Sequence, residues 1–155
     1  MKKFFVLYAV MALFAFGCAH REAATIKPEG KPMAKVDAIK AGKEEGTIDK
    51  QFFKKIVADN PVNVSLVDVR TKFEYDAGHF DSSRHVFIND LFDKGCDATL
   101  ARLPKDGFIV FVCATGARAG EMYFEIKDNC KYSNVKNLFF LDAEVAYTPK
   151  GPVIK

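Results

Sequence analysis

One cysteine in this chain has the surroundings of a nucleophile. Cys113 directly follows an apolar run, 108–112, and is followed by small residues and then by Arg118. A run this rich in β-branched and aromatic residues predicts a central strand buried on both faces, and a helix is expected from Arg118 onward. In open α/β sheets, ligands bind at the carboxyl ends of the strands. We therefore expect Cys113 to lie in a ligand site between a strand and a helix.

The loop after Cys113 is suited to holding an anionic sulfur. A short turn of this kind directs backbone N–H groups inward, and the N-terminus of the next helix adds its positive end. These donors and Arg118 stabilise a thiolate, which is the reactive form of cysteine. The same groups would hold the outer sulfur of a persulfide, so Cys113 and Arg118 are the predicted catalytic residues, and no cofactor is required. The predicted substrate-binding loop consists of Ala114, Thr115, Gly116, Ala117 and Arg118.

The elements that position this loop follow from apolar periodicity. Asp49 is the predicted N-cap of a helix that ends before Pro61. Strands that alternate with helices predict a three-layer α/β domain, in which a mostly parallel sheet is covered by helices on both faces. The other strands are predicted over 64–69, 86–88 and 135–141, and the other helices over 72–77, 89–103, 118–128 and 143–147.

The N-terminus carries a different pattern from the rest of the chain. Lys2 and Lys3 precede thirteen residues without charge, 4–16. This is the pattern of a secretory signal, and it is too short to span a bilayer, which needs about 20 residues. The sequence Ala-Phe-Gly-Cys that ends at Cys18 resembles a bacterial lipobox. The resemblance implies cleavage before Cys18 and lipid on its sulfur, with the protein anchored on the periplasmic side of the cell envelope. The alternatives are a plain signal peptide cleaved nearby and an uncleaved anchor.

Charge and composition set the domain limits and argue against one class of partner. The formal net charge is +3, and it falls to +1 without Lys2 and Lys3, with 21 basic against 20 acidic residues. A body so close to neutral has no electrostatic reason to bind nucleic acid. The segment before residue 46 contains several prolines, glycines and charged residues, and its apolar residues show only weak periodicity. We expect a signal peptide over 1–17, a lipid-attached tether over 18–45 and a folded domain over 46–155.

The remaining cysteines predict a disulfide rather than a metal site. Cys96 and Cys130 each lie 17 residues from Cys113, and the chain has no Cys-x-x-Cys pair and no nearby histidine pair, which argues against zinc. In an exported chain, three thiols of which one must stay reactive suggest that the other two are bridged. We therefore predict that Cys96 and Cys130 lie on the same side of the fold and form a disulfide, leaving Cys113 free.

Two segments resemble the rhodanese-like family. Cys-Ala-Thr-Gly-Ala-Arg-Ala at 113–119 resembles the family's active loop, Cys-x-x-Gly-x-Arg followed by Ala or Ser. Segment 66–80 resembles its motif Asp-x-Arg-x-x-x-Glu-Tyr-x-x-Gly-His-Ile. The motifs occur in the family's order, and the resemblance covers about residues 46–150. The chain departs from the family at 81–83 and at 141–147, where two glycines and a tryptophan are missing, and these departures concern the surroundings of the pocket.

The resemblance implies a sulfurtransferase without a metal ion. Such an enzyme takes sulfane sulfur from thiosulfate or a persulfide and passes it to a thiol or a cyanide-like acceptor through a persulfide on Cys113. The resemblance also suggests that Asp68, Arg70 and Glu74 support the loop rather than react. We expect Arg70 and Glu74, four residues apart, to pair across the turn between strand and helix, and Asp68 to anchor amides of the loop.

Two other functions remain open at this point. The first is a binding module of the cell envelope that carries sulfur for a partner or docks to one without turnover. Retention of both Cys113 and Arg118 argues against an inert module. The second is a phosphatase or arsenate reductase. Related enzymes of that kind place five residues between cysteine and arginine, whereas four stand between Cys113 and Arg118, and a smaller ring fits one sulfur atom better than a tetrahedral oxyanion.

Overall fold

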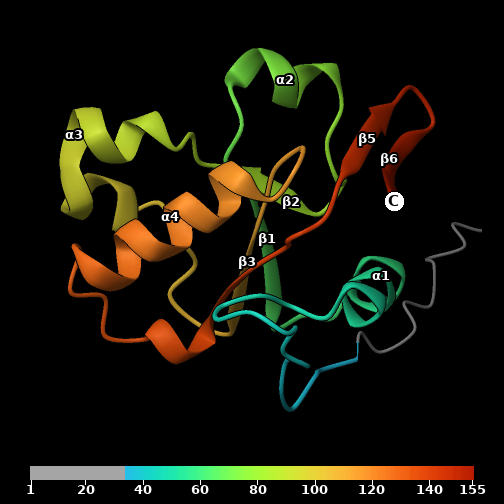
Figure 1. Cartoon of the computed structure of the whole chain (residues 1–155), viewed down its shortest axis with the longest axis horizontal. Coiled ribbons are helices and arrows are strands. Elements are labelled where there is room, and N and C mark those ends of the chain that lie inside the picture. Colours follow the sequence, from blue (N-terminus) through green and yellow to red (C-terminus); the bar gives the residue numbers. More distant parts are fainter. Residues whose placement is uncertain (1–33) are drawn as a thin grey trace, which may run out of the picture. The chain divides into compact units, whose positions relative to one another are not determined.

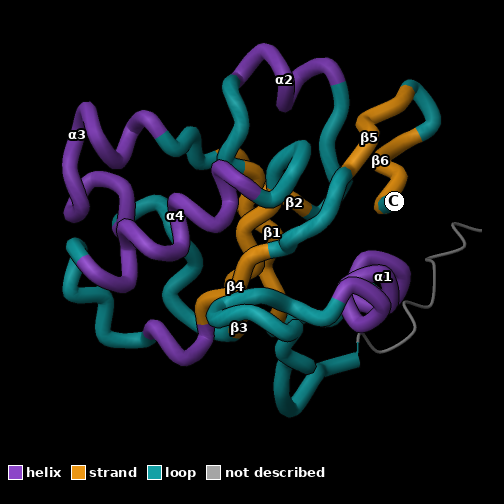
Figure 2. Tube along the Cα trace, viewed as in Figure 1, coloured by secondary structure: helices purple, strands orange, loops and turns teal. Residues whose placement is uncertain are grey.

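A four-stranded parallel sheet forms the centre of the domain. The computed structural model describes residues 34–155, so Cys18 and the predicted signal peptide lie outside the described residues. The strands are β1 (Val64–Asp68), β2 (Ser83–His85), β3 (Phe108–Val112) and β4 (Leu138–Phe140), in the order β2-β1-β3-β4. All three pairings are parallel. Figures 1 and 2 show this sheet in the middle of the domain, between helices.

Helices and a hairpin cover the two faces of this sheet. One apolar cluster joins alternate residues of β1 and β3 to α3 (Asn89–Leu100) and α4 (Ala117–Asp128). The other joins the intervening residues to α1 (Lys50–Asp59) and to β5 (Val145–Thr148), which pairs with β6 (Gly151–Ile154) in an antiparallel hairpin. In Figure 1, α3 and α4 lie on one side of the strands and α1 on the other. The three-layer α/β class predicted from periodicity is confirmed.

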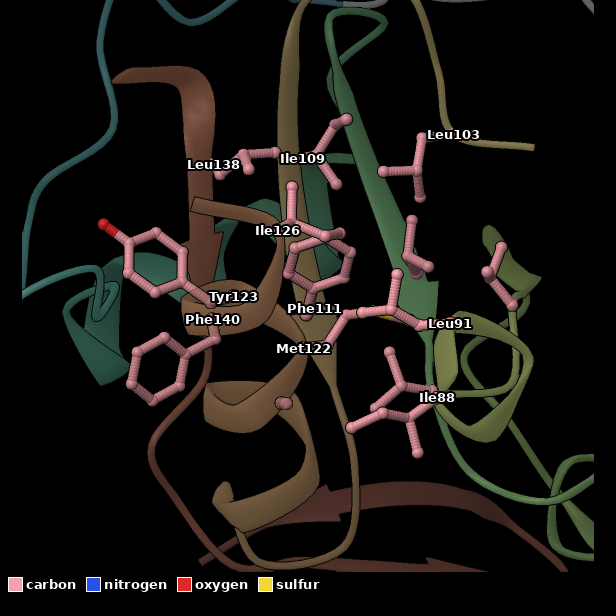
Figure 3. Packing of buried hydrophobic residues seen from close by; sticks show 14 of the residues in the cluster. Ile88, Leu91, Leu103, Ile109, Phe111, Met122, Tyr123, Ile126, Leu138 and Phe140 are labelled. Atoms are coloured by element: carbon pink, nitrogen blue, oxygen red, sulfur yellow. The ribbon is translucent and has the colours of Figure 1, made fainter. Parts of the chain in front are cut away.

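The central strand is β3, as its apolar sequence predicts. Ile109, Val110, Phe111 and Val112 are at most 1% exposed, because each face of the strand is covered by one of the two clusters. Figure 3 shows Phe111 against Met122 of α4. The residue that follows β3 is Cys113, so the core of the domain fixes the position at which the active loop begins.

Capping hydrogen bonds set the starts of the two helices that the sequence predicts at 50–60 and 72–77. Asp49 accepts a hydrogen bond from the Phe52 amide at 2.9 Å and caps α1. Thr71 and Glu74 form a reciprocal capping box at the start of α2 (Lys72–Ala77). In Figure 1, α2 lies at the end of the sheet to which β1 leads, so it lies near the loop that follows β3.

Several predicted elements differ from the structure. The strand expected at 86–88 is β2 at Ser83–His85, although Val86 and Ile88 still donate to main-chain oxygens of Asp68 and Val69. The helix expected over 89–103 ends at Leu100 and is interrupted at Gly95, which has φ 81° and ψ 175°. The strand expected over 135–141 is a 3-10 helix, η1 (Val135–Asn137), followed by β4.

The final helix predicted over 143–147 is wrong, because this segment is strand β5. Val145 is paired with Ile154 and Tyr147 with Pro152 of β6. Thr148 and Gly151 are paired across a two-residue turn, and Gly151 takes a φ of 106° that β-branched and bulky residues avoid. Thr148 Oγ1 closes the turn by donating to the Gly151 oxygen at 2.8 Å.

Residues on the N-terminal side of the predicted boundary at 46 contact the domain. The Val36 amide donates to the Asn63 side chain at 3.0 Å, and that side chain donates back to the Val36 oxygen at 2.7 Å. The Asp49 amide donates to the Lys40 oxygen at 2.9 Å, and Ile39 packs against the cluster that contains α1. Part of the predicted tether is therefore seated on the domain, and the boundary itself stays a prediction.

Candidate active site

Cys113 occupies the end of the central strand and is the free cysteine of the described residues. It lies on the same face of β3 as Phe111 and belongs to the cluster under α3 and α4. Only 1% of Cys113 is exposed, and its Sγ accepts a hydrogen bond from the Gly116 amide at 3.2 Å. Of the loop amides predicted to surround the sulfur, the Gly116 amide donates to Sγ. This hydrogen bond stabilises negative charge on Sγ.

Gly116 turns the loop from the strand into α4. Its φ of 89° lies in the left-handed region, which glycine adopts without steric cost. A Cβ at this position would lie 2.7 Å from Asp142 Oδ1 and 3.0 Å from Asp142 Cα, so the segment after β4 packs directly on the loop. Glycine is required here both by conformation and by space, and it places its amide on the cysteine sulfur.

Arg118, the other predicted catalytic residue, is bound by Glu74. Arg118 Nη1 donates to Glu74 Oε2 and Nη2 to Oε1, each at 2.7 Å, which is the bidentate geometry of a strong ion pair. The hydrogen bond from Arg118, followed by those from Thr71, lowers the pKa of Glu74 to about 2, although partial burial opposes this shift. The hydrogen bond to Glu74 raises the pKa of Arg118, and the negative charges of Glu74 and Cys113 act in the same direction.

The expected pairing of Arg70 with Glu74 is therefore wrong. Arg70 Nη2 instead pairs with Asp68 Oδ2 at 2.7 Å and donates to the Gly78 oxygen at 2.6 Å. Asp68 was expected to anchor loop amides, but its carboxylate accepts from the main chain and the guanidinium of Arg70. Asp68 is fully buried and Arg70 is 3% exposed, so this ion pair is part of the core beneath the site.

Tyr147 of the hairpin is a site residue that the sequence reasoning missed. Its hydroxyl donates to the Cys113 oxygen at 3.4 Å, and the Arg70 guanidinium carbon lies 3.3 Å from the centre of its ring. Burial raises its pKa, and the charge of Asp68 adds to this effect, so the hydroxyl stays protonated. The Val145 amide donates to the Ala114 oxygen at 2.8 Å, which ties the hairpin to the loop. The alternating residues and two-residue turn at 145–154 were the available signal.

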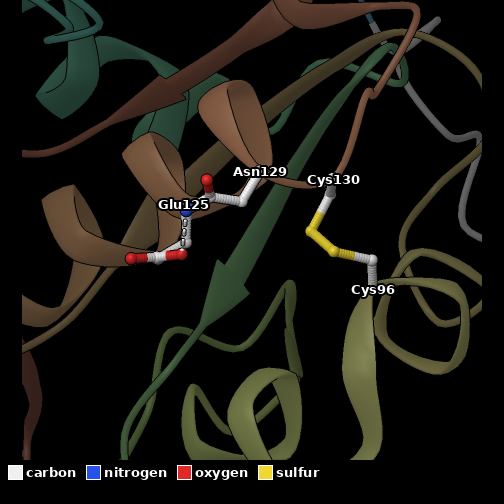
Figure 4. The surroundings of a disulfide bond; sticks show 4 residues. All are labelled: Cys96, Glu125, Asn129 and Cys130. Atoms are coloured by element: carbon white, nitrogen blue, oxygen red, sulfur yellow. Dashed lines mark hydrogen bonds between the residues drawn. A yellow bond between two sulfur atoms is a disulfide. The ribbon is translucent and has the colours of Figure 1, made fainter.

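The predicted disulfide between Cys96 and Cys130 is confirmed, with Cα atoms 5.3 Å apart. Figure 4 shows it between α3 and the chain that leaves α4. The 12 residues of α4 rise about 18 Å and separate this end of the helix from its first turn, which carries Arg118. The disulfide therefore lies at the opposite end of α4 from the candidate site.

The residues that the structure describes contain no candidate metal centre and no helix that could span a membrane. Within residues 34–155, no group of three or more His, Cys, Asp or Glu side chains is arranged to hold a metal ion. Among the helices of the same residues, none is both long and apolar enough to cross a bilayer.

The parallel sheet, the cysteine at the end of its central strand and the arginine in the following helix define the class to which the chain belongs. The family model of the rhodanese-like domain matches residues 49–142, which is more than half of the chain. The protein is a member of the rhodanese-like domain family. No curated protein sequence matches it significantly.

Solved structures of two rhodanese-related or rhodanese-like proteins and of one uncharacterized protein are similar to this chain. A rhodanese-related protein from Thermoplasma volcanium is 19% identical, with a TM-score of 0.47, over 63% of this chain and 84% of its own. A rhodanese-like domain protein from Staphylococcus aureus is 21% identical, with a TM-score of 0.46, over 68% of this chain and 93% of its own. An uncharacterized protein from Saccharomyces cerevisiae is 28% identical, with a TM-score of 0.46, over 59% and 80%.

Proposed function

We propose that this domain transfers sulfane sulfur from thiosulfate or a persulfide donor to a thiol or cyanide-like acceptor, through a persulfide on Cys113. The observation that carries the proposal is the free Cys113 at the end of β3, whose Sγ accepts the Gly116 amide at 3.2 Å. The amide would stabilise the thiolate before transfer. The four residues between Cys113 and Arg118 form a ring that suits one additional sulfur atom.

The proposed reaction has two steps. The Cys113 thiolate attacks the sulfane sulfur of thiosulfate, the sulfur–sulfur bond of the donor breaks, and sulfite leaves with its electron pair. The transferred sulfur becomes the anionic outer atom of the persulfide. An acceptor such as cyanide then attacks this outer atom, thiocyanate leaves, and the Cys113 thiolate is restored. Nucleophilic catalysis of this kind divides one transfer into two displacements at sulfur.

Intact mass tests the proposal directly. Incubation of the purified protein with a donor should add the mass of one sulfur atom, and cyanide should remove it. Cys113→Ser should abolish the gain because a hydroxyl cannot form a persulfide, whereas the double variant Cys96→Ser/Cys130→Ser should keep it. An undiminished gain in Cys113→Ser would refute the assignment of the nucleophile.

A sulfur-carrying or docking module of the cell envelope is the second candidate. Two observations favour it: Cys113 is 1% exposed, and Arg118 is already bound by Glu74. Both would slow free turnover with small donors. A persulfide that forms but is not discharged by any small acceptor would favour this module, whereas repeated turnover with cyanide would favour the enzyme.

A phosphatase or arsenate reductase is less well supported. A tetrahedral oxyanion has several oxygens to bind, and the loop offers one residue fewer between Cys113 and Arg118 than those enzymes have. Because Arg118 pairs with Glu74 through both terminal nitrogens, an oxyanion would also have to displace a carboxylate. Hydrolysis of an aryl phosphate that depends on Cys113 would reverse this ranking.

We propose further that the protein is exported and attached to the periplasmic side of the envelope by lipid on Cys18. The charge-free run 4–16 after Lys2 and Lys3 supports export. The disulfide between Cys96 and Cys130 agrees with it, because disulfides persist mainly in oxidising compartments. Several acyl chains on one residue would anchor the protein stably, whereas one would hold it weakly.

A further inference from the structure

The guanidinium of Arg118 is occupied by a residue of the same chain. Its two terminal nitrogens bind the two carboxylate oxygens of Glu74 at 2.7 Å each. Glu74 is itself fixed, because its Oε2 accepts from the Thr71 amide at 3.1 Å and the Thr71 hydroxyl at 2.8 Å. The carboxylate therefore occupies both terminal nitrogens of the guanidinium, and the capping box of α2 holds it there.

The other charged pair at the site cannot replace Arg118 as an anion receptor. Arg70 is buried against Asp68 and also donates to the Gly78 oxygen. Each of the two ion pairs is neutral by itself, so a Cys113 thiolate makes the site net negative. A donor with two negative charges meets repulsion at such a site, and buried charges are poorly screened by salt. A thiol persulfide is uncharged as R–S–SH and carries one negative charge when ionised, so it meets less repulsion than thiosulfate.

Resting on the sulfur transfer proposed above, we propose that Glu74 is a specificity-determining residue. It withholds Arg118 from the doubly charged donor and makes the site favour thiol persulfides, which carry at most one negative charge, over thiosulfate. Arg118, bound in this way, positions the start of α4 and its loop rather than the donor. Glu74 thereby sets the class of donor that the site accepts. The geometry of Cys113 alone does not determine this class.

The favoured step balances without another reactant. The Cys113 thiolate attacks the terminal sulfur of a persulfide R–S–SH, the sulfur–sulfur bond of the donor breaks, and R–S⁻ leaves with the electron pair. The proton stays on the transferred sulfur and is lost when the new persulfide ionises. No sulfonate group enters the site in this step, so Arg118 need not leave Glu74.

The test compares two donors in matched variants. Glu74→Gln removes the charge but keeps a side chain that can complete the capping box. Asp76→Asn is the control, since it removes one acidic charge from the same helix, where Asp76 pairs with exposed Lys72. The initial rate of persulfide formation on Cys113 is measured by mass spectrometry over a range of concentrations of thiosulfate and of the persulfide of 2-mercaptoethanol. For this half-reaction it gives the kcat/KM of each donor and its half-saturating concentration, taken as KM.

We expect the wild type to use the persulfide of 2-mercaptoethanol with the higher kcat/KM. Glu74→Gln should raise the ratio of thiosulfate to persulfide kcat/KM by about tenfold or more, since a contact to a charged group is worth roughly 1.5–3 kcal/mol. The gain should lie in the KM for thiosulfate, and Glu74→Gln/Arg118→Ala should lose it because the gain requires the freed guanidinium. Asp76→Asn should leave the ratio as it is in the wild type.

The outcomes separate this inference from the function on which it rests. A wild type that prefers thiosulfate overturns the role of Glu74 while leaving sulfur transfer intact. The same holds for a Glu74→Gln ratio equal to that of Asp76→Asn. A gain that survives in Glu74→Gln/Arg118→Ala also overturns it, because the gain would then not come from Arg118. If neither donor adds sulfur to Cys113, the proposed function fails and this inference fails with it.

Discussion

The disulfide between Cys96 and Cys130 should account for a large part of the stability of the domain. It closes a loop with a sequence separation of 34 residues. The chain-entropy model gives a stabilisation of about 4 kcal/mol for a loop of this length, through the constraint on the unfolded chain. Both side chains also pack against the cluster under α3 and α4, so the bridge fastens α3 to the C-terminal end of α4 without disturbing the core.

This free energy converts into a change in melting temperature. Unfolding entropy is about 2.1 cal/mol/K per residue, which for a folded domain of roughly 120 residues gives a fall in Tm of about 15 °C when the bridge is lost. Thermal unfolding of Cys96→Ser/Cys130→Ser, followed by circular dichroism, measures this fall. The wild type in reductant should melt near the double variant, and reductant should not lower the Tm of the variant further.

Cys113→Ser is the matched control, because it makes the same chemical change at a cysteine that closes no loop. Its Tm should stay much closer to that of the wild type, although Cys113 is buried. The reasoning is refuted if the double variant melts within about 3 °C of the wild type, a difference that corresponds to under 1 kcal/mol. It is also refuted if reductant lowers the Tm of the double variant as much as that of the wild type.

Two further predictions concern the anchor and the buried ion pair. Cys18→Ser should move the protein from the membrane fraction to the soluble fraction of its host, as followed by immunoblot, and unchanged fractionation would contradict lipid attachment. Asp68→Asn should lower the free energy of unfolding in urea by about 3–5 kcal/mol, because it leaves the charge of Arg70 buried without a partner. Asp76→Asn, which breaks an exposed pair with Lys72, should cost about 1 kcal/mol or less, and equal losses in the two variants would contradict this account.

The parts of the fold that the sequence predicts correctly are those determined by residues close together in the chain. The five apolar residues of β3 predict a strand covered on both faces, and both of its faces are covered. Asp49 and Thr71 mark helix starts because a side-chain oxygen satisfies free amides within three residues. Cys113 was identified in the same way, since a strand, a cysteine and a glycine-containing turn are consecutive in the chain.

The hairpin β5–β6 was missed because its short segment supports two interpretations. Residues 143–147 contain two alanines and a glutamate, which favour a helix, and their alternation spans too few residues to decide against it. What stabilises the strand is tertiary: the Val145 amide donates to the Ala114 oxygen, and Tyr147 packs under Arg70. Packing of this kind overrides a weak local propensity. Because the hairpin was not predicted, Tyr147 was not predicted as a site residue either.

The pairing of Glu74 with Arg118 depends on strand register, which local sequence does not contain. Asp68 and Val112 are partners in the parallel ladder of β1 and β3, and Glu74 and Arg118 each lie six residues further along their chains. Parallel strands end at the same edge of a sheet, so residues at equal distances beyond paired positions enter neighbouring loops. Arg70 is closer to Glu74 in sequence, but it lies before α2 and turns into the core to meet Asp68. A spacing of four residues indicates contact only within a helix, and since Arg70 lies outside the helix, the partner of Glu74 comes from the adjacent strand's loop.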